Sequence, residues 1–370
     1  MAWFVQHLRA VAVPDDLALR RLSDVPEELR TEVHDRLFDD RTLFYDCVPL
    51  QSGRLLLTGP HLRNLRPLVV RGLRAGGTRP RVRIRDIGRV TQTMVQGEGP
   101  VVLETAAGPV DVPVRESVAE RFSGRNVAVC VNKDNALGHV RDWLRFHVSA
   151  HGLDGVLVFD NGSTTYGVEE LARTMADVPG VAVAGVISAP FNYGGPFDLP
   201  GRRVRLQFLQ PALLNLARAE ALSRARAVLG VDIDELVVPL DGVSVFDAAA
   251  ARRIGFVRLG GQWVFPGPGA EAPARHGAHR FRQDPPLACG AKWAVRPDAL
   301  IPRLKGWNVH NVGGAIGYRT KVDPRFEILH CVATTTGWKP DSKRWRDWQA
   351  AVPDPRLGGI LDRYLPEVGA

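Results

Sequence analysis

The stretch from Val228 to Val238, with the sequence VLGVDIDELVV, places two aspartates inside an otherwise apolar run. Such a run predicts a strand that is buried on both faces. Residues two apart in a strand point to the same side, so Asp232 and Asp234 are expected to share a face. Two neighbouring carboxylates in a low-dielectric environment require a cation or a proton, which predicts a divalent-cation site that holds a diphosphate. The alternative is that the strand has ended and both acids face solvent in a turn.

Polar residues also follow two other apolar runs, in positions where they could bind a nucleotide. Asp160 and Asn161 come directly after GVLVF, and their carboxylate and amide groups could bind a base or a ribose hydroxyl. Lys133 and Asp134 lie in NKDN after VAVCV, where they could meet phosphate or base edges. The alternatives are an Asx turn in the first case and helix capping in the second. We interpret these four residues as a candidate donor-binding set.

Aromatic and histidine side chains later in the chain could complete such a site. Trp263, in WVFPGPG, offers a face suited to a sugar ring, and packing against the core is the alternative. His310 and His330 each follow an apolar run, and either could be a third metal ligand or a hydrogen-bonded core residue. His147 and His151 have the spacing of a zinc pair but lack a HExxH glutamate, so we expect them to serve in packing.

The elements that must position these residues change character along the chain. From residue 126 onward strands alternate with helices, which predicts a parallel α/β sheet with ligands at the carboxyl ends of its strands. A long helix from Gln207 is expected to end at Gly230 and to lead into the aspartate strand. Before that, short extended runs over 43–114, separated by turns, predict an antiparallel β-rich module. We therefore predict an accessory domain over 1–122, an α/β domain over 123–350 and a tail over 351–370.

Composition limits the class of protein further. The 370 residues are 45% hydrophobic, enough for a sizeable core, and no apolar run approaches the length of a membrane span. The first residues lack the sustained apolar core of a signal peptide, and the four scattered cysteines fit a reducing compartment. The net charge of +8 is spread without long blocks, which argues against nucleic-acid binding. We expect a cytoplasmic protein with at most peripheral membrane association.

Taken together, these segments resemble one family. Residues 126 to about 348 are similar to the family 2-like and family 92-like glycosyltransferases that have the α/β nucleotide-sugar fold called GT-A. The similarity lies in the order of seven segments, which are DWLRFH, HGLDGVLVFDNGSTT, QFLQPALLN, VDIDELVV, QWVFPGPG, GAKWAVRP and HCVATTTGWKPDSKRW. The implied fold is a GT-A-type nucleotide-sugar-binding sheet with flanking helices, preceded by a smaller β-rich domain.

The resemblance implies sugar transfer from a nucleotide-diphosphate donor, with a UDP-sugar favoured, to a glycan or other hydroxyl acceptor. The setting would be surface polysaccharide or glycoconjugate synthesis. By this resemblance Asp232 contacts the donor and, with Asp234, binds Mn²⁺ or Mg²⁺, while Asp160 contacts the base. A late histidine completes the metal shell, and His330 is preferred over His310.

The family relatives mostly invert the anomeric centre, which requires a carboxylate that takes the proton of the acceptor hydroxyl. Asp284, in the loop-rich stretch between WVFPGPG and GAKWAVRP, is our candidate base by its position. Glu235 resembles the acid that directly follows the family's DxD motif and is included in the catalytic set. Trp263 and Trp338 are placed on the acceptor side.

Two other functions remain open at this stage. The sequence Lys133-Asp134-Asn135 stands where such families have Lys-Asn-Glu, which is compatible with a non-catalytic glycan- or nucleotide-binding protein whose transferase domain is degenerate. A nucleotidyltransferase also uses paired acids with Mg²⁺, but VNKDNALGH has no Gly-rich phosphate loop.

Overall fold

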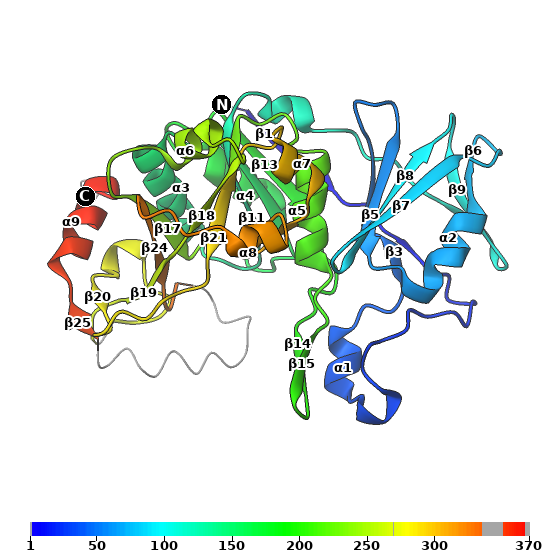
Figure 1. The fold of residues 1–370 in the computed structure, drawn as a ribbon, viewed down its shortest axis with the longest axis horizontal. Coiled ribbons are helices and arrows are strands. Elements are labelled where there is room, and N and C mark those ends of the chain that lie inside the picture. The colour runs from blue at the N-terminus through cyan, green and yellow to red at the C-terminus, as the bar shows by residue number, and fades with distance from the viewer. Residues whose placement is uncertain (1, 269, 335–350, 367–370) are drawn as a thin grey trace.

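The computed structural model describes residues 2–268, 270–334 and 351–366, and it is a mixed α/β structure with several sheets (Figure 1). The largest sheet has the strand order β1-β13-β12-β11-β16-β21-β18. Its strands are β1 (Ala2–His7), β13 (Val183–Ser188), β12 (Gly155–Asp160), β11 (Asn126–Asn132), β16 (Ala227–Gly230), β21 (Lys292–Val295) and β18 (Phe256–Leu259). The first five are parallel, and β21 runs antiparallel to both of its neighbours. The predicted α/β class is thus confirmed.

Helices cover both faces of this sheet. The helices are α3 (Leu137–His151), α4 (Val168–Ala176), α5 (Leu209–Ala219) and α6 (Val245–Ala251). Successive residues of β11 alternate between two cores, because Ala128 packs with α3, α4 and α6, whereas Val127 packs with α5. The β-branched strand residues and the apolar faces of the helices therefore form a layered core. Helix α3 ends at His151 and is capped by Gly152, whose φ of 66° suits a glycine.

A second sheet continues from the first and carries the late segments of the chain. Its order is β17-β24-β19-β20-β25. The strands are β17 (Glu235–Pro239), β24 (Phe326–Cys331), β19 (Gly261–Phe265), β20 (Phe281–Arg282) and β25 (Val352–Pro353). Helix α9 (Pro355–Tyr364) follows β25, and its residues Leu357 and Leu361 belong to the core shared with α3. Residues 352–364 are thus part of this domain, which corrects the predicted tail.

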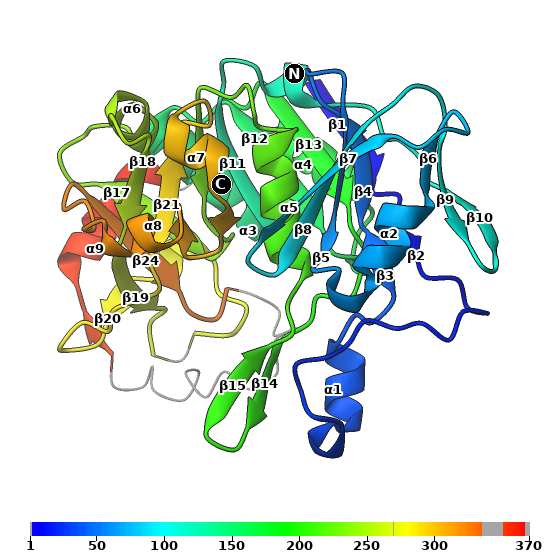
Figure 2. The ribbon, with the colours of Figure 1, turned by 45° about the vertical axis from the view of Figure 1, so that its right-hand side comes forward.

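The β-rich N-terminal module is antiparallel, as predicted. A four-stranded sheet contains β4 (Asp46–Pro49), β5 (Leu55–Pro60), β8 (Val90–Gln96) and β7 (Arg81–Ile87). Smaller sheets contain β10 (Gly108–Asp111), β9 (Val101–Thr105) and β6 (Leu73–Ala75), and the pair β2 (Val11–Ala12) and β3 (Thr42–Phe44). Helix α2 (Arg66–Gly72) packs on this module. Helix α1 (Glu32–Leu37) and the hairpin β14 (Pro196–Leu199) with β15 (Arg202–Arg205) project together from the body (Figures 1 and 2).

The division between the two parts differs from the prediction in one respect. The first strand, β1, lies in the main sheet beside β13, so residues 2–7 belong to the α/β part although they begin the chain. The parts also share a core, in which Tyr45 and Leu56 of the N-terminal module pack with Leu213 of α5. Within this interface the Gln92 side-chain amide donates to the backbone carbonyl of Asn215 (3.1 Å). The Arg218 guanidinium donates to the side-chain oxygen of Gln92 (2.8 Å).

The long helix predicted to end at Gly230 is about half as long. Helix α5 ends at Ala219, and Glu220 is buried with its carboxylate bound to Arg115, Ser117 and the Val118 N–H. Gly230 is the last residue of β16, where a Cβ would overlap the ring of Trp293. The glycine therefore serves close packing between strands and not a helix end.

The remaining short elements lie near the edge strand β18 or in turns. They are α7 (Leu300–Leu304), β22 (Trp307–Asn308), β23 (Asn311–Val312), α8 (Ala315–Arg319) and the 3₁₀ turns Glu27–Leu29, Arg63–Leu65, Ala119–Phe122 and His276–Ala278. None of the helices in the described ranges is both long enough and apolar enough to cross a bilayer.

Candidate metal centre

The two aspartates lie in a turn between two sheets. Strand β16 ends at Gly230, and β17 begins at Glu235 in the second sheet. The Glu235 N–H donates to the Asp232 carbonyl (3.1 Å), which closes the turn. The prediction of one continuous strand with both acids on one face is therefore wrong, because the apolar run contains the ends of two strands. The turn is not solvated like a loop, since Ile233 is buried and its carbonyl accepts from His276 Nε2 (2.8 Å).

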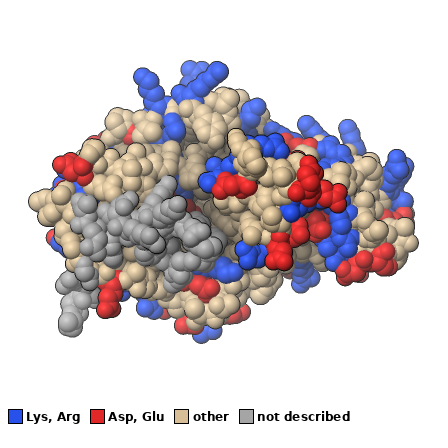
Figure 3. Space-filling model, turned by 90° about the horizontal axis from the view of Figure 1, so that it is seen from below, with Lys and Arg blue, Asp and Glu red and all other residues tan. Residues whose placement is uncertain are grey.

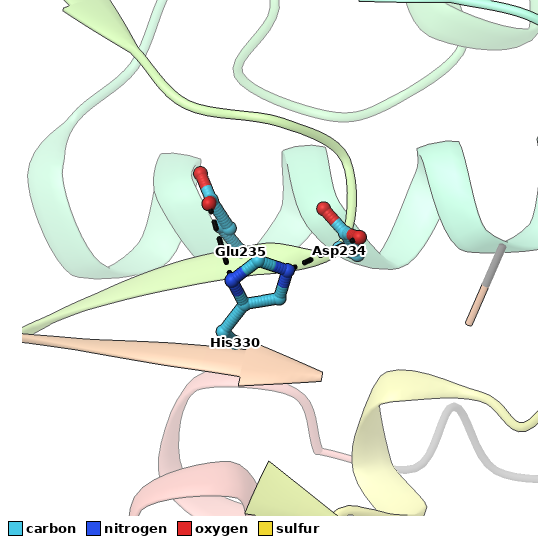
Figure 4. A group of neighbouring side chains, drawn as sticks. All are labelled: Asp234, Glu235 and His330. Atoms are coloured by element: carbon cyan, nitrogen blue, oxygen red, sulfur yellow. Dashed lines mark ion pairs between the residues drawn. The ribbon is translucent and has the colours of Figure 1, made fainter. Parts of the chain in front are cut away.

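Strand register brings three side chains into a row beside this turn. His330 of β24 pairs with Glu235 of β17 on one side and with Trp263 of β19 on the other. Directly paired residues share a face of the sheet, so the three side chains are neighbours. The rings of Trp263 and His330 stack with 3.7 Å between centroids. His330 Nε2 lies 3.3 Å from Asp234 Oδ2, and His330 Nδ1 lies 3.4 Å from Glu235 Oε1 (Figure 4).

Asp234, Glu235 and His330 fit a divalent metal ion. Each offers one ligand atom, and these atoms lie within 4.8 Å of one another. Glu235 Oε1 and His330 Nδ1 are buried and have no hydrogen-bond partner among the described residues. These two atoms form an ion pair at 3.4 Å but no hydrogen bond, so a metal ion that both side chains coordinate would satisfy them. Two carboxylates and an imidazole form a donor set suited to Mn²⁺.

Asp232 has a different partner, Lys292, which we did not predict from the sequence. The ammonium of Lys292, at the start of β21, lies 2.5 Å from Asp232 Oδ2 and 3.0 Å from Glu235 Oε2. The Lys292 side chain is 2% exposed, and the second Glu235 oxygen also accepts from the Asp232 N–H (2.9 Å). Part of the positive charge that the paired acids require is therefore supplied by the chain itself. The available signal was a single lysine in the otherwise apolar stretch KWAV.

Burial and opposite charges set the protonation of this centre. Burial alone would lower the pKa of His330, but the carboxylates of Asp234 and Glu235 outweigh it and raise that pKa to about 10. Burial raises the pKa of Glu235, and the Lys292 ammonium opposes this shift. Burial also disfavours charge on Lys292, but Asp232 and Glu235 raise its pKa overall. Without metal, His330 is thus a cation at neutral pH, and metal binding there must displace a proton.

The predicted donor-binding residues lie in loops that are bound to each other. The Asp160 carboxylate, at the end of β12, accepts from the Asn132 amide (2.8 Å), the Ser163 N–H (2.9 Å) and the Ser163 hydroxyl (2.6 Å). Asp134, with φ 52°, accepts from the Thr164 and Thr165 N–H groups (2.6 and 3.0 Å). Asp160 therefore takes the turn role that the sequence left open, whereas Asp134 caps no helix and instead binds the loop after β12.

The two remaining donor-side residues occupy the same loops. The Asn161 amide donates to the carbonyls of Ala189 and Phe191, each at 2.8 Å, and so ties the loop after β12 to the loop after β13. Lys133 is half-buried directly after β11. All four predicted donor-side residues lie where the parallel strands β11 and β12 end.

Buried histidines hold the turn and β17 in place. The Val237 N–H of β17 donates to His147 Nε2 (3.3 Å), and His151 Nε2 donates to the Val237 carbonyl (2.7 Å). His147 Nδ1 donates to the Trp143 carbonyl (2.8 Å), which fixes its tautomer. Burial lowers the pKa of His147 to about 3 and that of His151 to about 4. The i, i+4 pair is thus a neutral packing clamp, as expected from the sequence.

Two other predicted residues, His310 and Asp284, lie apart from the three-ligand cluster. His310 is exposed, and its Nδ1 donates to the Ala291 carbonyl (3.0 Å), next to Lys292. Asp284 is exposed and pairs with Arg282 (3.1 Å), which lines a separate pocket of about 520 Å³ with Gln262 and Glu327. Trp338 lies outside the described residues.

No protein-family model matches this chain, and no curated protein is significantly similar to it. The function of the centre is therefore inferred from its geometry and chemistry.

Proposed function

We propose that the protein is a metal-dependent glycosyltransferase that moves a sugar from a nucleotide-diphosphate sugar to a hydroxyl acceptor. The observation that carries the proposal is the convergence of Asp234, Glu235 and His330, with ligand atoms within 4.8 Å of one another. The cluster directly follows β16, a strand of the parallel part of the main sheet. Open α/β sheets bind their ligands at this edge.

The surroundings of the centre support a nucleotide-sugar ligand. The loops that follow the parallel strands β11, β12 and β16 lie at the same edge of the sheet, so the polar residues after them and the acidic turn face a common region. Figure 3 views the molecule from below Figure 1 and shows basic and acidic side chains intermixed on this face. Trp263 stacks on His330 and brings an aromatic face beside the metal ligands.

A bound Mn²⁺ or Mg²⁺ would neutralise charge on the departing diphosphate. The chain's own residues prepare for this step in distinct ways. Asp234, Glu235 and His330 hold the ligand atoms in place, and Lys292 fixes Asp232 and the second Glu235 oxygen. For the proton of the acceptor hydroxyl we propose Asp284, because its carboxylate is exposed and its loop leads directly into Lys292.

The test is nucleotide release from a UDP-sugar. We expect the wild-type protein to release UDP with Mn²⁺ and to lose most of this activity with a chelator or in Asp234→Asn, because the leaving group then lacks its counter-charge. Asp247→Asn, which removes a carboxylate paired with Arg226 on the surface of α6, serves as the matched control and should remain active. Equal release by wild type and Asp234→Asn would refute the proposal.

A second function is favoured by the internal pairing of Asp232. Because Lys292 already binds one of the two aspartates, the chain could bind a glycan or nucleotide without turnover. A thermal-shift screen of UDP-, GDP-, CMP- and dTDP-sugars with Mn²⁺ separates the two functions when combined with the release assay. Stabilisation by a nucleotide sugar without any release of nucleotide would favour the binding protein.

A further inference from the structure

Residues 299–322 contain four lysines and arginines and no aspartate or glutamate. The cations are Arg303, Lys305, Arg319 and Lys321. All four are exposed, and none forms an ion pair with another residue in the described ranges. The acids that border the segment are paired elsewhere, Asp298 with Arg296 (3.1 Å) and Asp323 with Arg325 (2.9 Å). The segment therefore presents to solvent positive charge that no acid of the described ranges pairs with.

The same segment exposes large apolar side chains. Five of them are between 40% and 66% exposed, and these are Leu300, Leu304, Ile316, Tyr318 and Val322. Single apolar residues on a surface are ordinary, but a group of them within one short segment is not. Helix α7 presents Leu300 and Leu304 one turn apart on the same face. This combination of cations and apolar side chains is typical of a surface that binds an amphipathic partner.

Contacts show that these residues form one surface, which we call the α7–α8 surface. A Cβ on Gly313 would lie 2.9 Å from Ile301, so the turn before α8 packs against α7. The turn before β18 lies against α7 in the same way, because Gly255 touches Ala299 and Pro302. This turn adds the exposed Ile254 and Arg253 to the surface. Figure 1 shows α7 and α8 on the side of the molecule that faces the viewer.

We propose that the α7–α8 surface binds an anionic membrane peripherally. The aliphatic side chains would enter the boundary between headgroups and acyl chains, and the cations would meet the lipid phosphates. A second copy of the chain is disfavoured as the partner, because a two-fold interface would place these cations against each other. Single-stranded nucleic acid is disfavoured because the exposed residues are mainly aliphatic and offer little surface for base stacking. The inference does not depend on the proposed transferase activity.

The α7–α8 surface is connected to the candidate metal centre through the chain. The Asn308 carbonyl accepts from Trp293 Nε1 (2.6 Å), and His310 Nδ1 donates to the Ala291 carbonyl, next to Lys292. The segment that would meet the membrane thus also packs beside the strand that carries Lys292. Membrane binding by this surface would therefore place the candidate metal centre close to the bilayer.

The experiment is vesicle co-sedimentation of the full chain. We use phosphatidylcholine vesicles with and without phosphatidylglycerol, at low and at high salt. The wild-type protein is expected to bind only the vesicles with phosphatidylglycerol and to bind less at high salt. The double variant Arg319→Glu, Lys321→Glu should lower the partition coefficient about tenfold or more. Each cation near an anionic surface adds separately to the free energy of binding.

Two further variants make the test specific. Leu300→Ser with Ile316→Ser keeps the charge and should also weaken binding, because the apolar contribution is lost. Arg71→Glu with Arg141→Glu changes the net charge by the same amount at exposed positions outside the α7–α8 surface and should bind like wild type. Unchanged circular dichroism establishes that each variant is folded.

Three outcomes would overturn the proposal. The first is no binding of the wild type to phosphatidylglycerol vesicles. The second is an equal loss of binding in the control variant, which would show that net charge alone matters. The third is competition for the surface, in which an RNA oligonucleotide or a second copy of the chain, detected by sedimentation, prevents binding of the vesicles.

Discussion

At the scale of single residues, Lys292 is the feature that most changes the interpretation of the acidic motif. Its ammonium lies between Asp232 and the fully buried Glu235, at 2.5 and 3.0 Å. The paired aspartates thus have two different cationic partners, since Asp234 faces His330. A DxD motif in sequence predicts the need for positive charge, but not whether a lysine or a metal supplies it.

Removal of Lys292 should therefore be costly. In Lys292→Met the buried Glu235 loses its counter-charge, and we expect the free energy of unfolding in urea to fall by about 3 kcal/mol or more. Lys321→Met, an exposed lysine without an ion pair to a described residue, is the matched control and should change stability by less than about 0.5 kcal/mol. An equally stable Lys292→Met would show that the ammonium does not hold the two carboxylates.

At the scale of elements, α3 positions the candidate centre through its clamp on β17. His147 and His151 bind both backbone groups of Val237, two residues beyond Glu235. Both imidazoles are kept neutral by burial, with pKa values of about 3 and 4. The clamp therefore holds as long as these side chains stay unprotonated.

Because both histidines of this clamp are buried in neutral form, we expect the free energy of unfolding to fall in acid. A folded pKa below the unfolded value of about 6.5 means that the unfolded chain binds the extra proton, so stability falls as pH drops from about 6.5 toward about 4. Each histidine contributes a slope of about 1.4 kcal/mol per pH unit in this range. His147→Gln should reduce the measured slope by about that amount, whereas the exposed His7→Gln should leave it unchanged. Equal slopes in His147→Gln and wild type would contradict the clamp.

The regular elements were predictable where the pattern is local. Strands β11, β12 and β13 and helices α3 and α4 follow from alternating apolar runs and a Gly stop at 152. The assignment of Asp232 and Asp234 to one strand failed because β17 is defined by its pairing with β24, which lies about ninety residues later. Lys292 was missed for the same reason, since its partners Asp232 and Glu235 are some sixty residues earlier in the chain. The only local signal of this long-range pairing is the single lysine in the apolar stretch KWAV, which does not identify its partners.

At the scale of the whole molecule, the N-terminal module and the α/β part are joined by a buried ionic contact. The Arg115 guanidinium lies 2.8 Å from Asp46 of β4 and 3.0 Å from Glu220 after α5. Burial raises the pKa of Asp46 to about 6, although Arg115 opposes this shift. Together with the shared apolar core, this contact predicts that the two parts unfold cooperatively.

Unfolding should therefore occur in a single transition. Far-UV circular dichroism reports both parts, whereas tryptophan fluorescence reports the α/β part, because residues 8–125 contain no tryptophan. We expect the two urea curves to coincide. Arg115→Met should lower the free energy of unfolding in both curves by about 3–5 kcal/mol, since two buried carboxylates then lose their counter-charge. Two separate transitions in the wild-type protein would show that the parts fold independently.

The central claim is that Asp234, Glu235 and His330 bind a divalent metal ion, and calorimetric titration of Mn²⁺ tests it most directly. We expect one site in the wild type, at least about tenfold weaker binding in Asp234→Asn and in His330→Gln, and unchanged binding in Asp284→Asn, whose carboxylate lies apart from the cluster. Equal Mn²⁺ affinity in the wild type and in Asp234→Asn would contradict the account.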